Sequence, residues 1–306
     1  LIAIGMRFDD RVTGDLKTYA KQAKVIHLDI DNSEIGKNVP VDVKVLGNAK
    51  HTIPMITALL EERKRPEWNA EFELDAQEEY EKVIEKELYP MNGSLKMGEV
   101  VRKVSEATGN DAVLVTDVGQ NQMMGVRYFK YKRTRSVVTS GGLGTMGFGL
   151  PAAMGAKFGA PDRTVCFFTG DGGMQMNIQE FATAVLEELP LILCVFNNTY
   201  LGMVRQWQKL FYGKRYSMTD LRAGAATRRG EEHPPKYTPD FVKLAESYGA
   251  KGIRVTEKSE MKAAFEQAKA NRALKVPTLI EFMLDPEVQV YPMVRPGGTL
   301  EDLLMD

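Results

Sequence analysis

Residues 167–181 read FFTGDGGMQMNIQEF, and this stretch decides what the chain can form and bind. An apolar run stops before Gly170, Asp171 stands between two glycines, and a helical pattern follows. Glycines let the backbone turn and approach a ligand closely, and ligands of open α/β sheets bind beyond the carboxyl ends of the strands. The stretch therefore predicts a buried strand that ends in a binding site containing a carboxylate.

The composition is that of an ordinary soluble globular protein. The chain has 306 residues, of which 43% are hydrophobic and 26% charged, with a net charge of −1. Its length favours about two domains, and the balanced charge gives no sign of a nucleic-acid or membrane partner. No apolar stretch approaches the roughly 18 to 20 residues of a membrane span. Since the chain starts at Leu1 without Met, we expect a fragment.

Cysteine usage points to a reducing compartment. Cys166 and Cys194 both lie inside apolar runs, where free thiols usually pack as small core residues. His27, His51 and His233 lack the spacing of zinc ligands. We therefore expect neither a disulfide nor a zinc site, and a bacterial cytoplasmic location.

From residue 96 onward, apolar runs alternate with amphipathic helical patterns. This alternation predicts an α/β fold with a doubly wound parallel sheet covered on both faces. Upstream, the ranges 1–8 and 24–31 read as strands of part of a second Rossmann-like α/β domain, and 51–65 reads as helical. Acidic residues dominate 61–87, as in a solvated helix or linker, and the domain boundary is placed there. The predicted divisions are 1–65, a linker at 66–95, a ligand-binding domain at 96–285 and a tail at 286–306, with 222–237 as a polar surface loop.

Four strand ends are expected on one rim of the larger sheet, in the segments TDVGQ, TSGG, TGDGG and FNNTY. A right-handed crossover between the last two would bring Asp171 close to Asn198. A carboxylate and an amide oxygen are hard ligands suited to Mg²⁺, which completes its octahedron with water and phosphate oxygens. The pair therefore predicts a magnesium ion that holds a diphosphate, with backbone NH groups of the NIQEF helix near the anion. A simple helix cap at Asp171 is the alternative.

This pairing is the signature of thiamine-diphosphate enzymes, and the resemblance extends along the chain. The chain resembles the acetolactate synthase (acetohydroxyacid synthase) catalytic-subunit family in the segments MRFDDRVTG, VIHLDIDNSEIGK, DVGQNQM, SGGLGTMGFGLPAA, GDGGMQMNIQE, NNTYLGMVRQWQ and PGGTL. The resemblance implies a thiamine-diphosphate-binding fold in 96–285. It also implies that 1–65 is the C-terminal part of a central, FAD-associated domain.

The resemblance assigns site residues position by position. Mg²⁺ would be bound by Asp171, Asn198 and the backbone carbonyl of Tyr200. Thiamine diphosphate would be contacted by Val118, Gly119, Gln120, Asn121, Gly144, Met146, Gly170, Gly172, Gly173, Leu201, Gly202 and Met203. Substrate would meet Arg11, Met203 and Trp207. FAD would be contacted by Gly5, Arg7, Phe8, Asp9 and Asp29.

The implied activity is decarboxylation of a 2-keto acid, usually pyruvate, and ligation of the remaining unit to a second 2-keto acid, in branched-chain amino acid biosynthesis. The family's activating Glu lies in an N-terminal domain before the start of the resemblance. No catalytic residue is therefore assigned to this chain, which we expect to be inactive alone. A homodimer or tetramer and a small regulatory subunit are the implied partners. Asn121, Gly173 and Pro296 depart from the residues common in the family.

Other interpretations stay open. The chain could belong to another thiamine-diphosphate carboligase or decarboxylase, or be a catalytically silent cofactor-binding fragment. GLGTMG at 142–147 fits a dinucleotide-binding pattern, but no acidic residue follows at the required strand end. RYFKYKRTR at 127–135 mixes basic and aromatic residues, as in single-strand nucleic-acid binders, against a balanced overall charge.

Overall fold

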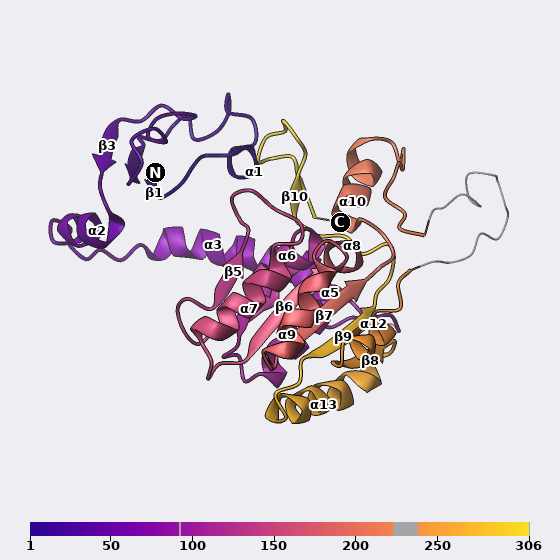
Figure 1. The fold of residues 1–306 in the computed structure, drawn as a ribbon. Coiled ribbons are helices and arrows are strands. Elements are labelled where there is room, and N and C mark those ends of the chain that lie inside the picture. Colours follow the sequence, from indigo (N-terminus) through magenta and orange to yellow (C-terminus); the bar gives the residue numbers. More distant parts are fainter. Residues whose placement is uncertain (92, 223–237, 306) are drawn as a thin grey trace. The chain divides into compact units, whose positions relative to one another are not determined.

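The computed structural model describes residues 1–91, 93–222 and 238–305 (Figure 1). The chain divides into two compact units, Leu1–Val83 with Tyr291–Asp306, and Ile84–Val290. The chain passes from one unit to the other between Val83 and Ile84, and returns between Val290 and Tyr291. Most of the predicted loop at 222–237 lies outside the described residues, and only Arg222 of that range is described.

The larger unit is built on a six-stranded sheet of order β5-β4-β6-β7-β9-β8, in which every pair is parallel. The strands are β4 (Val113–Thr116), β5 (Val137–Thr139), β6 (Val165–Gly170), β7 (Ile192–Asn197), β8 (Lys251–Val255) and β9 (Thr278–Met283). The central strands are buried almost throughout, as expected of a parallel sheet with both faces covered. The predicted doubly wound α/β fold is confirmed.

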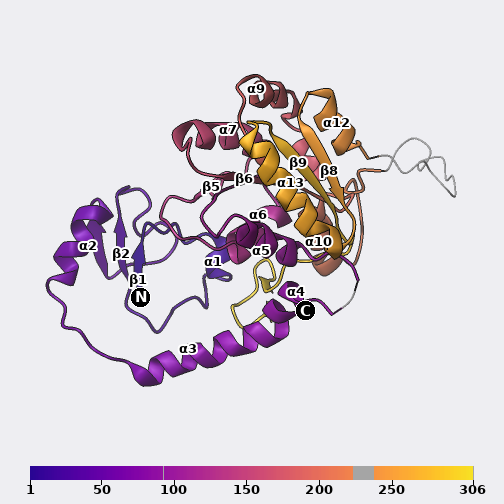
Figure 2. The same cartoon turned by 90° about the horizontal axis from the view of Figure 1, so that it is seen from below.

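Helices of this unit cover both faces of the sheet (Figures 1 and 2). One face packs against α5 (Met97–Ala107), α6 (Gln120–Tyr128) and α13 (Met261–Ala273). The other packs against α7 (Gly149–Gly159), α9 (Phe181–Leu186) and α12 (Phe241–Ser247). Alternate residues of β6 enter the two cores, with Phe168 on the first face and Phe167 on the second. The other helical elements among the described residues of this unit are α4 (Glu85–Leu88), α8 (Asp171–Met174), η2 (Ile178–Glu180), α10 (Gly202–Phe211) and η3 (Lys258–Glu260).

The smaller unit contains a three-stranded parallel sheet of order β1-β2-β3. Its strands are β1 (Ile2–Ile4), β2 (Ile26–Asp29) and β3 (Val43–Leu46), and its helical elements are α1 (Asp10–Thr13), α2 (Ala49–Thr57), α3 (Pro66–Glu79) and the π-helix η1 (Tyr80–Ile84). The tail pairs β10 (Met293–Val294) with β11 (Leu303–Leu304) and joins this unit through the Asp15 N–H, which donates to the Gly298 carbonyl at 2.8 Å.

Three local predictions differ from the structure. The helix expected over 51–65 ends at Thr57, and Pro66 begins a separate helix, as a proline at the first helical position favours. The helix expected from NIQEF onward is split into η2 and α9. The first helical turn after β6 is instead α8, which starts at Asp171 itself. Among the described residues, no helix is long and apolar enough to cross a membrane.

Candidate functional site

The carboxyl edge of the larger sheet contains a cavity. Because β4, β6 and β7 are parallel neighbours, the segments that follow them open to the same edge. Together with the start of α10 these segments enclose about 190 Å³. The lining residues are Met97, Val118, Gly119, Gln120, Asn121, Met146, Gly170, Asp171, Gly172, Gly173, Phe196, Asn198, Tyr200, Leu201, Gly202, Met203 and Val204.

Asp171 supplies the carboxylate of this cavity. It follows β6 and is only 2% exposed. Its Oδ1 accepts a hydrogen bond from the Gly172 N–H at 2.9 Å, and its Oδ2 accepts one from the Thr199 N–H at 2.6 Å. Burial raises the pKa of Asp171 to about 7, although these hydrogen bonds oppose the shift. Among the described residues no Lys or Arg pairs with it, so a bound cation would supply the missing counter-charge.

Asn198 lies beside Asp171, at the end of the neighbouring strand β7. Its side chain is buried, donates from Nδ2 to Gln120 Oε1 at 3.2 Å and accepts at Oδ1 from the Tyr200 N–H at 3.1 Å. Thr199, between Asn198 and Tyr200 in the sequence, has φ +65°, an unusual conformation for a β-branched residue. This turn directs the Thr199 N–H at Asp171, so the ends of β6 and β7 are joined through a carboxylate.

Tyr200 is held by a backbone pairing and by two arginine side chains. The segment 199–201 pairs antiparallel with 219–221, through Leu201 N–H to Thr219 O at 2.9 Å and Leu221 N–H to Thr199 O at 3.1 Å. The guanidinium of Arg205 lies 4.1 Å from the Tyr200 ring centroid, and that of Arg222 donates to the Tyr200 hydroxyl. The backbone of Tyr200 is therefore fixed at the cavity wall.

The donor set fits a hydrated magnesium ion. It offers one carboxylate, one amide oxygen and a backbone carbonyl, which are hard oxygen ligands. Asn121 Oδ1 is also buried and has no hydrogen-bond partner among the described residues, so it is available to a metal-bound water. No group of three or more His, Cys, Asp or Glu side chains suited to a metal occurs in the described ranges.

A side chain at either of two glycines would crowd its neighbours in this cavity. A Cβ on Gly202 would lie 2.1 Å from Gln120 Oε1 and 2.7 Å from Asn198 Nδ2. A Cβ on Gly172 would lie 2.7 Å from Leu201 Cδ2. The backbone at Gly172 and Gly202 therefore lies close against side chains of the cavity wall, where glycine fits without displacing them.

Comparison with known proteins identifies the fold family. Residues 117–282 match the model described as "Thiamine pyrophosphate enzyme, C-terminal TPP binding domain", and residues 1–56 match the central domain of the same enzymes. This chain belongs to the thiamine pyrophosphate enzyme family. Thiamine pyrophosphate is another name for thiamine diphosphate, so the predicted family is confirmed.

Within the family, the chain is similar to acetolactate synthase large subunits. It is 42% identical over 314 residues to the probable large subunit of Methanocaldococcus jannaschii, covering 99% of this chain and 49% of that relative. It is 42% identical to the large subunit of Corynebacterium glutamicum, covering 99% of this chain and 47% of that relative. The large subunit of Haemophilus influenzae is 37% identical, with 100% and 51% covered. The chain thus spans about half the length of the curated relatives it matches.

Not all predicted residues of the family's site reach the first cavity. Met203 lines it, whereas Trp207 lines a second cavity of about 800 Å³ with Met203, Val204, Gln208, Tyr212 and Arg215. Gly144 does not line either, although a Cβ there would lie 3.9 Å from Val118 Cγ1. Gln120 lines the first cavity, but its side-chain amide bonds to Asn198, Gln206 and Val288.

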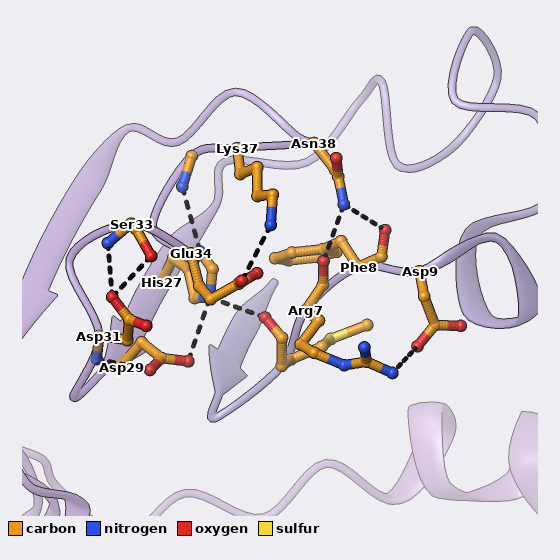
Figure 3. A network of polar contacts seen from close by, with 12 residues as sticks. Arg7, Phe8, Asp9, His27, Asp29, Asp31, Ser33, Glu34, Lys37 and Asn38 are labelled. Carbon is orange, nitrogen blue, oxygen red and sulfur yellow. Dashed lines mark hydrogen bonds and ion pairs between the residues drawn. The ribbon is translucent and has the colours of Figure 1, made fainter. Parts of the chain in front are cut away.

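The residues predicted to contact FAD gather in the smaller unit (Figure 3). Gly5 follows β1 and donates to the Leu28 carbonyl at 2.9 Å. Asn38 Nδ2 donates to the carbonyls of Arg7 and Phe8 at 3.0 and 3.1 Å, which fixes the segment after β1. Asp29 ends β2. FAD contacts there remain a prediction.

Two further predicted residues of this unit lie at the start of α1. Asp9 caps α1 by accepting from the Arg11 N–H at 3.0 Å, and its carboxylate lies 3.5 Å from Arg7. Arg11 bonds to Asp10 at 2.9 Å, so its guanidinium makes a local surface pair. A substrate contact by Arg11 remains a prediction.

Sequence reasoning missed Asp117. This buried residue follows β4, and its carboxylate accepts from the N–H groups of Gly147 at 3.0 Å, Gly149 at 3.2 Å and Val118 at 2.8 Å. It thereby fixes the loop that carries Gly144 and Met146 against the end of β4. Its position in TDVGQ, at a strand end like that of Asp171, was the available signal.

Proposed function

We propose that this chain is the C-terminal, cofactor-binding part of an acetolactate synthase. Support comes from 42% identity to acetolactate synthase large subunits over 99% of the chain. The observation that carries the proposal is the placement of Asp171 and Asn198 at neighbouring strand ends around one cavity. A thiamine-diphosphate carboligase or decarboxylase of another specificity is the second candidate, because both residues belong to the superfamily signature.

In this proposal Asp171, Asn198 and the carbonyl of Tyr200 hold Mg²⁺, whose charge compensates the diphosphate. Asp171 then stays ionised, since a nearby cation offsets the cost of its burial. Asn121 accepts from a water on the metal. The glycines at 119, 170, 172, 173 and 202 keep side chains away from the diphosphate, and Val118, Gln120 and Leu201 complete the wall.

The remaining contacts divide between cofactor ring and substrate. Met146 and Gly144 support the aminopyrimidine, while Met203 and Trp207 on α10 meet the 2-keto acid; the resemblance implies a substrate contact for Arg11 of the smaller unit as well. Bound thiamine diphosphate supplies a carbon nucleophile and an electron sink for decarboxylation and carbon–carbon bond formation. Met97, Phe196 and Met203 give the cavity an apolar wall, which would limit the access of water to a bound cofactor. Gly5, Arg7, Phe8, Asp9 and Asp29 bind FAD, which has no redox step to perform in this reaction.

The complete enzyme requires more than this chain. The cofactor-activating Glu comes from an N-terminal domain supplied across a homodimer or tetramer interface, and a small regulatory subunit is a further partner. In the domain assignment we propose, 1–65 belongs to the FAD-associated domain, 66–95 is a linker, 96–285 binds thiamine diphosphate, and 286–306 is a tail.

Product analysis tests the proposal. The chain is incubated with pyruvate, thiamine diphosphate, Mg²⁺ and FAD, alone and after joining to the N-terminal half of the Corynebacterium glutamicum relative. We expect negligible acetolactate from the chain alone and clear formation from the joined polypeptide. Strong formation by the chain alone would refute the need for the N-terminal Glu. A joined polypeptide that consumes pyruvate but yields another product would favour the second candidate.

A further inference from the structure

Three buried side-chain amides form a continuous chain in the larger unit. Asn198 Nδ2 donates to Gln120 Oε1 at 3.2 Å, and Gln120 Nε2 donates to Gln206 Oε1 at 3.0 Å. Asn198 and Gln120 are each 4% exposed, and Gln206 is 2% exposed. Gln120 comes from α6, Gln206 from α10 and Asn198 from the end of β7. Groups buried this deeply must find their partners within the protein.

Backbone groups fix the far end of this chain. The Val290 N–H donates to Gln206 Oε1 at 2.9 Å, and the Val290 carbonyl accepts from Gln206 Nε2 at 2.8 Å. The Val288 carbonyl accepts from Gln120 Nε2 at 2.7 Å. A backbone N–H only donates and a carbonyl only accepts, so each of these contacts allows one orientation of the side-chain amide.

The orientation passes along the chain to Asn198. Because the nitrogen of Gln120 faces Val288 and Gln206, its oxygen must face Asn198. Asn198 therefore turns its own nitrogen toward Gln120. Its oxygen points away from Gln120 and accepts from the Tyr200 N–H. A reversed Asn198 amide would place two oxygens together and offer the metal a nitrogen that cannot coordinate it.

We propose that Gln120 and Gln206 are positioning residues that set the orientation of the Asn198 amide and thereby the Mg²⁺ affinity of the site. This inference rests on the proposed function, in which Asn198 is a metal ligand. Outer residues that orient metal ligands typically change metal affinity by about 10- to 100-fold when replaced.

The same chain links the metal site to α10. Gln206 lies on this helix between Met203 and Trp207, and the helix is tied to the segment 287–290 by Arg205 and Lys209, which bond to Glu287 at 2.7 and 3.0 Å. A movement of α10 away from this segment would release Gln206 from Val290 and free the Asn198 amide to turn. Metal affinity and the position of α10 are then coupled, as thermodynamic linkage requires.

Metal dependence separates positioning from simple core stability. We would titrate thiamine diphosphate calorimetrically into the chain at a series of Mg²⁺ concentrations and find the Mg²⁺ concentration for half-maximal binding. Gln120→Met and Gln206→Met should raise it about 10-fold or more. Gln122→Met is the matched control, because Gln122 also lies on α6 but bonds to Thr139, and it should change the value less than about twofold.

A conservative variant at Gln206 and a double variant extend the test. Gln206→Glu keeps a side-chain oxygen that accepts from the Val290 N–H and from Gln120 Nε2, the contacts that set the orientation of the Gln120 amide. It should therefore keep the Mg²⁺ requirement within about threefold of wild type, even though the melting temperature falls. The double variant Gln120→Met/Gln206→Met should be little worse than the worse single variant, since the residues act in series.

The outcomes are distinct. An unchanged Mg²⁺ requirement in both Met variants, with Asp171→Ala abolishing binding, would overturn the positioning role and leave the metal site intact. If Asp171→Ala also binds thiamine diphosphate with the wild-type Mg²⁺ requirement, the proposed function itself fails. If the Met variants do not fold, Gln206→Glu decides alone, because a requirement raised about 10-fold in this variant would contradict the inference.

Discussion

The Thr199 backbone N–H donates to the Asp171 carboxylate across 2.6 Å. This bond joins the turn after β7 to the turn after β6 and explains the strained φ of Thr199. The carboxylate is thereby buried, held in one orientation and short of positive charge. Such a group is suited to bind a cation.

The titration of Asp171 should control metal affinity. Its folded pKa of about 7 lies above its ordinary value because of burial. Mg²⁺ binds the ionised form, so the Mg²⁺ concentration required for thiamine diphosphate binding should rise about 10-fold per pH unit below 7. Calorimetry between pH 5.5 and 8 measures this dependence. A flat profile would show that Asp171 is not the titrating ligand.

The raised pKa of Asp171 also makes the free energy of unfolding depend on pH. Without metal, this free energy should fall as the pH rises, whereas metal affinity should increase. Between about pH 4 and 7 the folded chain holds a proton on Asp171 that the unfolded chain has lost, so stability falls as pH rises through this window. Asp171→Asn cannot titrate and should flatten this part of the profile. Urea unfolding at several pH values, in the presence of chelator, compares the two proteins. Equal slopes would argue against a raised pKa.

Gly202→Ala should damage the metal site. The added Cβ would lie 2.1 Å from Gln120 Oε1 and must push apart the Gln120–Asn198 pair. We expect at least a 10-fold higher Mg²⁺ requirement. Gly155→Ala is the control, because its Cβ meets nothing within 4 Å on α7, and it should stabilise the helix by roughly 0.5–1 kcal/mol. Similar Mg²⁺ requirements in both variants would contradict the close packing at Gly202.

Arg205 should stabilise the Tyr200 turn through stacking as well as charge. Its guanidinium lies 4.1 Å from the Tyr200 ring and 4.0 Å from the Tyr216 ring, and it pairs with Glu287. Arg205→Lys keeps a cation for Glu287 but loses the planar stack, so we expect a loss of about 1 kcal/mol. Chemical denaturation of wild type, Arg205→Lys and Arg205→Ala measures it. Wild-type stability in Arg205→Lys would assign the effect to the ion pair alone.

Asp117 should be essential for the order of the loop at 144–149. Asp117→Ala leaves the buried N–H groups of Gly147 and Gly149 without their acceptor, which costs about 1–3 kcal/mol per group. Asp162→Ala, at an exposed position, should change stability by less than about 0.5 kcal/mol. Hydrogen exchange at Gly147 and Gly149 reports the local effect. Unchanged protection in Asp117→Ala would refute the clamp.

Much of the larger unit could be predicted because its signals are local. Buried parallel strands read as apolar runs, and the polar residues that end them, Asp171 and Asn198, mark the edge that binds ligand. Gln206 could not be found this way. A glutamine on an amphipathic helix indicates the solvent face, and its burial depends on Val290, which is 84 residues away. Asp117 was recognisable by position, but its partners at 147 and 149 depend on the loop geometry.

The central claim is that Asp171 and Asn198 hold a divalent ion that carries a diphosphate. Calorimetric titration of the chain with thiamine diphosphate, in Mg²⁺ and in excess chelator, tests it most directly, with Asp171→Ala alongside. We predict weak binding in Mg²⁺ and no measurable heat in chelator or in Asp171→Ala. Equal binding with and without Mg²⁺, or unimpaired binding by Asp171→Ala, would contradict the claim.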